Sequence, residues 1–124
     1  MRDDVAESLP LAVLVVEDHP LVLMTAVSMI EEAGLTAFAA RDADEALAML
    51  DGPVRIDAML TDLDMPGSMD GLELVLTVQR RWPHVRTLIT SGGRRPELPE
   101  LRGEVGFYQK PYNPRLVIEA LRAA

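Results

Sequence analysis

The chain has 124 residues, of which 48% are hydrophobic and 26% charged, a composition typical of one globular domain and unlike that of a disordered segment. Its 12 basic and 20 acidic residues give a net charge of −8, which disfavours direct binding to nucleic acid or to an anionic membrane surface. The chain has no cysteine, so disulfides, thiolate metal ligands and cysteine nucleophiles are excluded.

The N-terminal stretch is polar, and no segment of the chain reaches the roughly 20 consecutive apolar residues that span a bilayer. Residues 1–10 also lack the apolar core of a secretory signal peptide. We therefore expect residues 1–9 to form a polar tail, residues 10–124 to form one domain, and the protein to be cytoplasmic without membrane contact.

Short apolar runs alternate with segments of helical spacing along the chain. The runs expected to form strands are residues 11–16, 35–39, 56–60, 85–90 and 105–108. The segments expected to form helices are residues 20–33, 43–50, 72–82 and 114–124. Pro20, and Pro114 after Asn113, are favoured first helical residues. Asp42 and Asp70 each stand three residues before a glutamate, as in a capping box.

Strand and helix alternate with short connections, which predicts an α/β domain with a five-stranded, mostly parallel, doubly wound sheet and helices on both faces. In such a sheet, ligands bind beyond the carboxyl ends of the strands. The residues that follow the expected strands are therefore the candidates for a functional site. Those with polar or small side chains are Glu17, Asp18, Asp62, Asp64, Ser91, Gly92, Gly93 and Lys110.

Each candidate residue also has a purely structural explanation. Asp18 could cap the helix that follows it. Asp62 and Asp64 could be turn residues. Ser91 could be a turn hydroxyl, and Lys110 a surface lysine. Together they match one chemistry, because crowded carboxylates favour a bound Mg²⁺, a carboxylate can form an aspartyl phosphate, and an amine and a hydroxyl can stabilise phosphoryl oxygens.

In order and spacing, four short motifs resemble the receiver domain of bacterial two-component response regulators, over roughly residues 10–123. The motifs are VLVVED (13–18), LTDLDMPGSMDG (60–71), SG (91–92) and KP (110–111). The resemblance implies a flavodoxin-like sheet with the strand order 2-1-3-4-5. It also implies a Mg²⁺-dependent phosphorylation switch in a signalling relay, with a histidine kinase or phosphotransfer protein as the phosphoryl donor.

The resemblance assigns a role to each motif residue. Asp62 is implied to be the phospho-acceptor, with Ser91 and Lys110 binding the phosphoryl oxygens. Phe107 is implied to change rotamer on activation. The residues implied to hold Mg²⁺ are Glu17, Asp18, Asp62 and Asp64, the last through its backbone carbonyl. The positions implied to tune the phosphoryl lifetime are the Asp64 side chain and Gly93, and the Lys110–Pro111 peptide bond is implied to be cis.

The sequence departs from the family pattern in three places. The loop at Gly67–Met69 is one residue longer than its commonest form. A strand register shifted by one residue would make Thr90 the switching hydroxyl, although the small Gly92 favours Ser91. The stretch between Ser91 and Lys110 is short for the family and is interrupted by Pro96, Pro99 and Gly103. We therefore expect the fourth helix to be short or irregular and the usual output face to be altered.

The favoured function is that of a stand-alone receiver that signals through a protein partner, because the chain ends soon after its last expected helix; alternatively, the domain belongs to a longer chain. A second hypothesis is a haloacid-dehalogenase-type phosphatase with Asp62 as nucleophile and Asp64 as acid/base, although such enzymes place this motif on their first strand. A third is a receiver-like binding module that is never phosphorylated.

Overall fold

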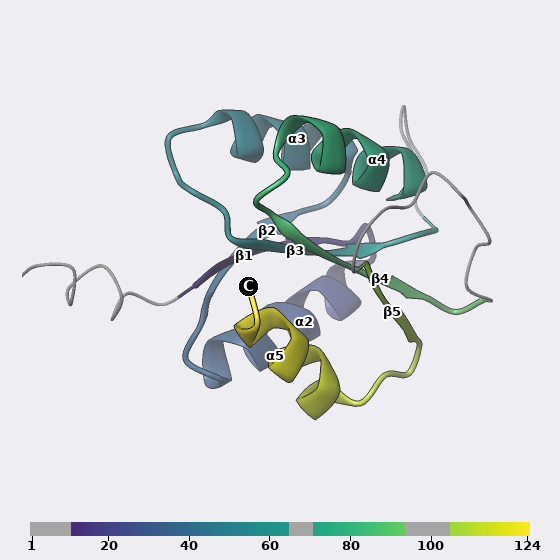
Figure 1. Cartoon of the computed structure of the whole chain (residues 1–124). Helices are drawn as coiled ribbons and strands as arrows, with labels where there is room; N and C mark the ends of the chain where they lie inside the picture. Colours follow the sequence, from purple (N-terminus) through teal and green to yellow (C-terminus); the bar gives the residue numbers. More distant parts are fainter. Residues whose placement is uncertain (1–10, 65–70, 94–104) are drawn as a thin grey trace, which may run out of the picture.

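Five parallel strands form one sheet in the order β2-β1-β3-β4-β5, in a computed structural model that describes residues 11–64, 71–93 and 105–124 (Figure 1). The strands are β1 (Ala12–Val16), β2 (Thr36–Ala40), β3 (Ala58–Asp62), β4 (Arg86–Ser91) and β5 (Gly106–Gln109). The predicted doubly wound α/β fold and its strand order are confirmed.

The described residues also form four helices that cover both faces of the sheet. They are α2 (Pro20–Glu32), α3 (Ala43–Asp51), α4 (Gly71–Arg81) and α5 (Pro114–Arg122). Helices α3 and α4 lie on one face, and α2 and α5 lie on the other (Figure 1). Each helix lies within one or two residues of its predicted bounds, so the four predicted helices are confirmed.

Strand β1 joins the two apolar layers of the molecule. Leu14 and Val16 pack with residues of α3 and α4, whereas Val13 and Val15 pack with residues of α2 and α5. Every residue of β1 is buried, as expected for an apolar run without polar alternation. The pairing of β1 with β2 and β3 ends at Val16, so Glu17 directly follows the strand at the carboxyl edge of the sheet.

Strand β3 spans Ala58–Asp62, so it begins and ends two residues later than the apolar run 56–60 that was expected to form it. Its polar end belongs to the ladder, since Asp62 lies opposite Thr90 in the pairing with β4. Apolar patterning misplaced this strand because it cannot detect polar residues that still pair through their backbones. The other four strands, β1, β2, β4 and β5, each begin one residue after the start of their apolar runs.

The predicted cap at the start of α3 is confirmed. The Asp42 carboxylate accepts a hydrogen bond from the Glu45 backbone N–H at 2.9 Å. The Glu45 carboxylate reaches back to the Arg41 backbone N–H at 2.8 Å, one residue before the usual partner. The first of these bonds satisfies a backbone donor that the first helical turn would otherwise leave free, and the second holds the residue before the cap.

Helix α2 begins without a side-chain cap. Its cap residue is His19, which makes no capping hydrogen bond, and Pro20 follows as the first helical residue. Asp18 therefore does not cap α2. Asn113 does cap α5, accepting a hydrogen bond from the Arg115 backbone N–H at 2.9 Å.

Four predictions fall on residues outside the described part of the chain: the polar tail 1–9, the longer loop at Gly67–Met69, the cap at Asp70 and the irregular helix within 94–104. These stay predictions. Among the described residues, no helix is both long enough and apolar enough to cross a membrane.

Candidate functional site

Three carboxylates meet at the carboxyl edge of the sheet, beyond β1 and β3. Glu17 directly follows β1, and its backbone N–H donates to the Ala40 carbonyl at 3.0 Å. Ligand oxygens of Glu17, Asp18 and Asp62 lie within 4.8 Å of one another. Glu17 is 5% exposed and Asp62 6%, whereas Asp18 is exposed. The acidic cluster is thus buried on its sheet side and open to solvent at Asp18.

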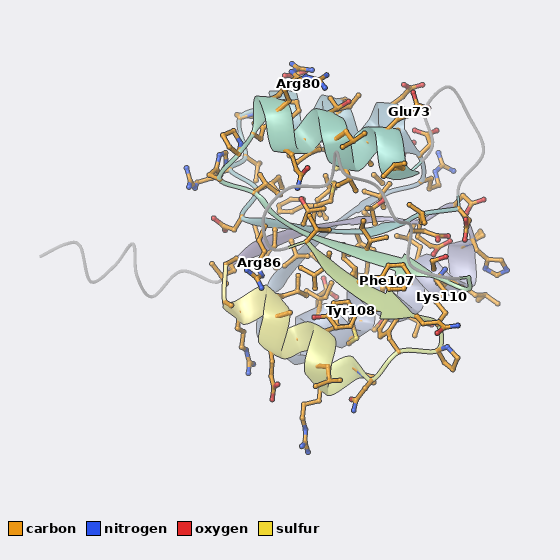
Figure 2. All side chains as sticks on the ribbon, turned by 45° about the vertical axis from the view of Figure 1, so that its right-hand side comes forward. Glu73, Arg80, Arg86, Phe107, Tyr108 and Lys110 are labelled. Carbon is orange, nitrogen blue, oxygen red and sulfur yellow. The ribbon has the colours of Figure 1, made fainter. Side chains whose placement is uncertain are left out.

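Lys110 places a positive charge against this cluster. Its Nζ lies 3.0 Å from Glu17 Oε1 and 3.2 Å from Asp62 Oδ2. The Lys110 backbone N–H donates to the Ser91 carbonyl at 2.7 Å, which holds the residue at the end of β5 (Figure 2). The Lys110–Pro111 peptide bond is cis, as predicted. Four of the predicted site residues are therefore in one place.

The charges of the cluster are only partly balanced. Burial raises the pKa of Glu17, against the hydrogen bonds from the His19 N–H and from Lys110, and the nearby Asp62 charge raises it further. Burial alone would lower the pKa of Lys110, but its hydrogen bond to Glu17 and the charges of Asp62 and Glu17 raise it above its ordinary value. Lys110 is therefore positively charged at neutral pH, and the carboxylates still favour an additional cation.

The Asp64 side chain has a partner that the sequence did not indicate. Ser91 Oγ donates to Asp64 Oδ2 at 2.9 Å, and Ser91 Oγ accepts from the Gly93 backbone N–H at 3.0 Å. The Asp64 backbone N–H in turn donates to Asp62 Oδ1 at 3.1 Å. Sequence reasoning placed these residues at neighbouring strand ends, but it could not pair their side chains because that pairing depends on the path of the loop.

Two candidates remain, Thr90 and Phe107. Thr90, the alternative hydroxyl, is buried and lines a small enclosed space with Lys110 and Tyr112. Tyr112 was not predicted to belong to the site; burial raises the pKa of its hydroxyl, which therefore stays protonated at neutral pH. Phe107 is half-buried and packs against the apolar layer shared with α3 and α4 (Figure 2).

The start of α4 lies directly against the backbone of Asp62. The Gly71 N–H donates to the Leu63 carbonyl at 3.2 Å. A Cβ added at Gly71 would lie 2.2 Å from the Asp62 carbonyl oxygen, so a side chain does not fit there without backbone movement. Gly71 was not predicted as a site residue, although it ends the motif that contains Asp62.

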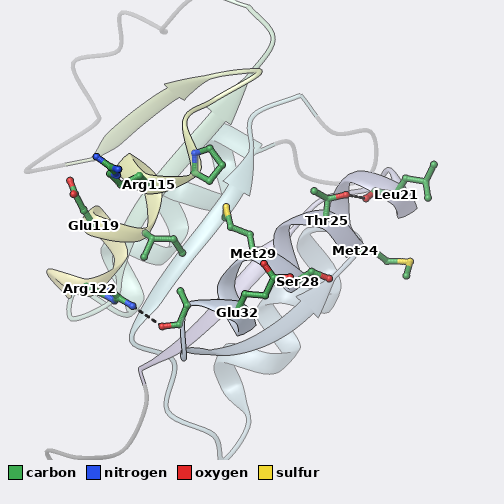
Figure 3. Close-up of a pocket in the computed structure, with 12 residues that line it drawn as sticks. Leu21, Met24, Thr25, Ser28, Met29, Glu32, Arg115, Glu119 and Arg122 are labelled. Carbon is green, nitrogen blue, oxygen red and sulfur yellow. Dashed lines mark hydrogen bonds between the residues drawn. The ribbon is translucent and has the colours of Figure 1, made fainter.

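A groove with a volume of about 1030 Å³ lies between α2 and α5, apart from the acidic cluster (Figure 3). The Arg122 guanidinium donates to the Ala33 carbonyl at 2.7 Å at one side of this groove. Leu21 and Met24 line it and are 69% and 65% exposed. Its lining contains none of the predicted site residues, so the groove is separate from the candidate site.

Comparison with known proteins places this geometry in a family. The sequence matches the family model of the response regulator receiver domain over residues 13–122. It is 35% identical over 116 residues to the nitrogen assimilation regulatory protein NtrX of Azorhizobium caulinodans, a match that covers 90% of this chain and 25% of NtrX. The chain thus spans about a quarter of the length of that curated relative.

Solved receiver structures have the same fold. The chemotaxis protein CheY4 of Vibrio cholerae is 28% identical with a TM-score of 0.81, covering 92% of this chain and 98% of its own. A response regulator receiver protein of Pseudomonas putida is 26% identical with a TM-score of 0.83, covering 94% and 99%. These matches give no support to the phosphatase hypothesis. From its sequence match over most of its length and from its sheet topology, the chain belongs to the receiver domain family of response regulators, which act in two-component signalling.

Proposed function

We propose that Asp62 is the phospho-acceptor of this receiver domain and that its phosphorylation is the signalling event. The observation that carries the proposal is the placement of Asp62: a carboxylate 6% exposed, grouped with Glu17 and Asp18 and 3.2 Å from the Lys110 ammonium. A structural aspartate needs one partner of opposite charge, whereas a cluster with three acids and one amine has room for more positive charge. That imbalance suits a site that binds a cation and a phosphoryl group together.

The phosphoryl donor is the phosphohistidine of a histidine kinase or of a phosphotransfer protein. An Asp62 carboxylate oxygen attacks phosphorus and forms an O–P bond, while the P–N bond to the imidazole breaks. The imidazole nitrogen keeps the electron pair of that bond and takes up a proton from solvent. Lys110 stabilises the phosphoryl oxygens, since its ammonium already lies against the accepting carboxylate.

The donor set of the acidic cluster fits Mg²⁺. Carboxylate oxygens of Glu17, Asp18 and Asp62 are hard ligands, and Asp18 leaves the cluster open for water and phosphoryl oxygens. We assign the ion to these three residues, with the Asp64 backbone carbonyl as a further ligand. Bound there, Mg²⁺ supplies positive charge that offsets the repulsion between the carboxylates and the incoming phosphoryl group.

We further propose that the chain promotes its own phosphorylation from small phosphodonors and its own dephosphorylation. Ser91 rather than Thr90 is the switching hydroxyl in this proposal, because the Ser91 hydroxyl already contacts Asp64, in the loop that follows the acceptor. Phe107 responds by changing its position against the α3 and α4 layer.

The output passes to a protein partner, since the net charge of −8 disfavours binding to nucleic acid.

Intact-mass measurement with a small phosphodonor tests the assignment of Asp62. With acetyl phosphate and Mg²⁺, the wild-type protein should gain one phosphoryl group, and Asp62→Asn should gain none while keeping its far-ultraviolet circular dichroism spectrum. Asp51→Asn, which changes an exposed carboxylate at the end of α3, is the control and should label like wild type. Undiminished labelling of Asp62→Asn would refute the proposal, and repeated turnover of a phosphomonoester would favour a phosphatase instead.

A further inference from the structure

The Ser91 hydroxyl already has a partner in this structure. Its oxygen lies 2.9 Å from Asp64 Oδ2, to which it donates, and it accepts from the Gly93 N–H at 3.0 Å. A serine hydroxyl has one proton, so while it donates to Asp64 it cannot donate to a phosphoryl group on Asp62. Any contact of Ser91 with the phosphoryl group therefore requires the bond to Asp64 to break.

The backbone around this hydrogen bond is fixed at both ends. The Asp64 N–H donates to Asp62 Oδ1 at 3.1 Å, which ties Asp64 to the acceptor carboxylate. The Ser91 carbonyl accepts the Lys110 N–H at 2.7 Å, and Ser91 is 1% exposed. In this structure the backbone on both sides of the hydroxyl is therefore held by hydrogen bonds.

We propose that Asp64 is a positioning residue that holds the Ser91 hydroxyl away from Asp62 in the resting protein and thereby lowers the population of the switched state. This inference rests on the proposed function of Asp62. A hydrogen bond to an ionised carboxylate is stronger than one between neutral groups. The free energy needed to break it disfavours the switched state. Phosphorylation shifts the equilibrium because the phosphoryl oxygens offer Ser91 a more highly charged acceptor.

Asp64 could also oppose phosphorylation without Ser91, by direct repulsion between its carboxylate and the phosphoryl group. The two mechanisms differ in one respect: the first needs the Ser91 hydroxyl and the second does not. A double-mutant cycle over the two residues separates them.

The test is a titration of the wild-type protein, Asp64→Ala, Ser91→Ala and the double variant with beryllofluoride in saturating Mg²⁺, followed by isothermal titration calorimetry. Asp64→Ala should bind the phosphoryl mimic roughly tenfold more tightly than wild type, close to the lower end of what one hydrogen bond to a charged group contributes. In the Ser91→Ala background, the same Asp64→Ala change should have little effect. Asp64→Asn keeps an acceptor oxygen and loses the charge, so it should give a smaller gain in affinity than Asp64→Ala.

Two results would overturn the inference. An equal gain from Asp64→Ala with and without Ser91 would show direct repulsion, and no gain, or a loss, in the wild-type background would show that Asp64 does not restrain the switch. Failure of the wild-type protein to bind beryllofluoride in Mg²⁺ would instead refute the proposed function itself, so the two failures are distinguishable.

Discussion

Asp62 and Asp64 are two residues apart and chemically identical, yet their surroundings differ. Asp62 ends a buried strand and faces Lys110, whereas Asp64 is exposed and accepts a hydrogen bond from Ser91. Strand periodicity explains the difference in part, since residues at i and i+2 share a face only while the strand continues. β3 ends at Asp62, so the loop decides where the Asp64 side chain points.

Gly71 is expected to be needed for the position of Asp62. In Gly71→Ala, the added Cβ would lie 2.2 Å from the Asp62 carbonyl oxygen, and either α4 or the end of β3 must move. Overpacking of this kind typically lowers the free energy of unfolding by about 1–3 kcal/mol. We expect that loss in urea unfolding, together with slower phosphorylation by acetyl phosphate.

Gly92→Ala is the matched control for this change. Among the described residues, a Cβ at Gly92 would have no neighbour within 4 Å, so the stability of this variant should stay close to that of wild type. Equal stability of Gly71→Ala and wild type would contradict the close approach of α4 to the backbone of Asp62.

Removing the Lys110 ammonium is expected to destabilise the protein in a pH-dependent way. In Lys110→Met, Glu17 and Asp62 lose their shared partner, and the pKa of Glu17, already raised by burial, should rise further. A carboxyl whose pKa is raised by folding opposes folding when ionised, so the deficit should be largest at neutral pH. It should shrink as the pH falls through the raised pKa of Glu17.

Urea unfolding of Lys110→Met at several pH values, without Mg²⁺, measures this effect. Lys110→Arg keeps the positive charge and should lose less stability at neutral pH. A deficit that stays constant as the pH falls would mean that Lys110 acts by packing and not by its charge.

At the scale of elements, α3 offers a direct test of the cap that the sequence predicted. Asp42→Ala removes the acceptor of the Glu45 N–H and should lower the free energy of unfolding by about 1 kcal/mol. Asp42→Ser keeps a capping oxygen and should recover most of that loss. If both variants matched wild type in urea unfolding, the cap would contribute nothing to stability.

The sequence allowed the elements to be predicted better than their ends. Apolar runs located all five strands, but β3 extends two residues beyond its run because Thr61 and Asp62 pair with β4. Pro20 marked the start of α2 correctly, while Asp18, a plausible cap by its type, makes no cap. Sequence signals thus located the elements, whereas strand ends and helix caps depend on backbone pairing and side-chain orientation that residue type alone does not give.

The candidate site could be predicted from the sequence only in part. Glu17, Asp62 and Lys110 could be predicted together because parallel strands bring their carboxyl ends to one edge. The bond between Asp64 and Ser91 and the contact of Gly71 with Asp62 could not, since both depend on the loop that leaves β3. The roles assigned to Ser91 and Phe107 rest on the family resemblance and stay predictions.

At the scale of the whole molecule, the acidic cluster should couple metal binding to stability. Mg²⁺ that binds only the folded state stabilises it, by about 2.7 kcal/mol at a free concentration of about 100 times Kd. The midpoint of thermal unfolding should therefore rise with Mg²⁺ concentration, and Asp18→Asn should weaken the rise by removing one ligand.

The control for this prediction is Glu31→Gln, which removes an exposed charge at the other end of α2. Its thermal response to Mg²⁺ should match that of wild type. An unchanged response of Asp18→Asn would contradict the assignment of the metal to this cluster.

The central claim is that Asp62 carries the phosphoryl group, and borohydride trapping tests it most directly. Reduction converts an aspartyl phosphate to homoserine, and tryptic cleavage after Arg55 and Arg80 leaves Asp62 in one peptide with Asp57, Asp64 and Asp70. Fragmentation of that peptide should place homoserine at position 62, only after treatment with both phosphodonor and Mg²⁺. Homoserine at Asp64 or at another aspartate, or its absence from position 62 in a protein that has gained a phosphoryl group, would contradict the claim.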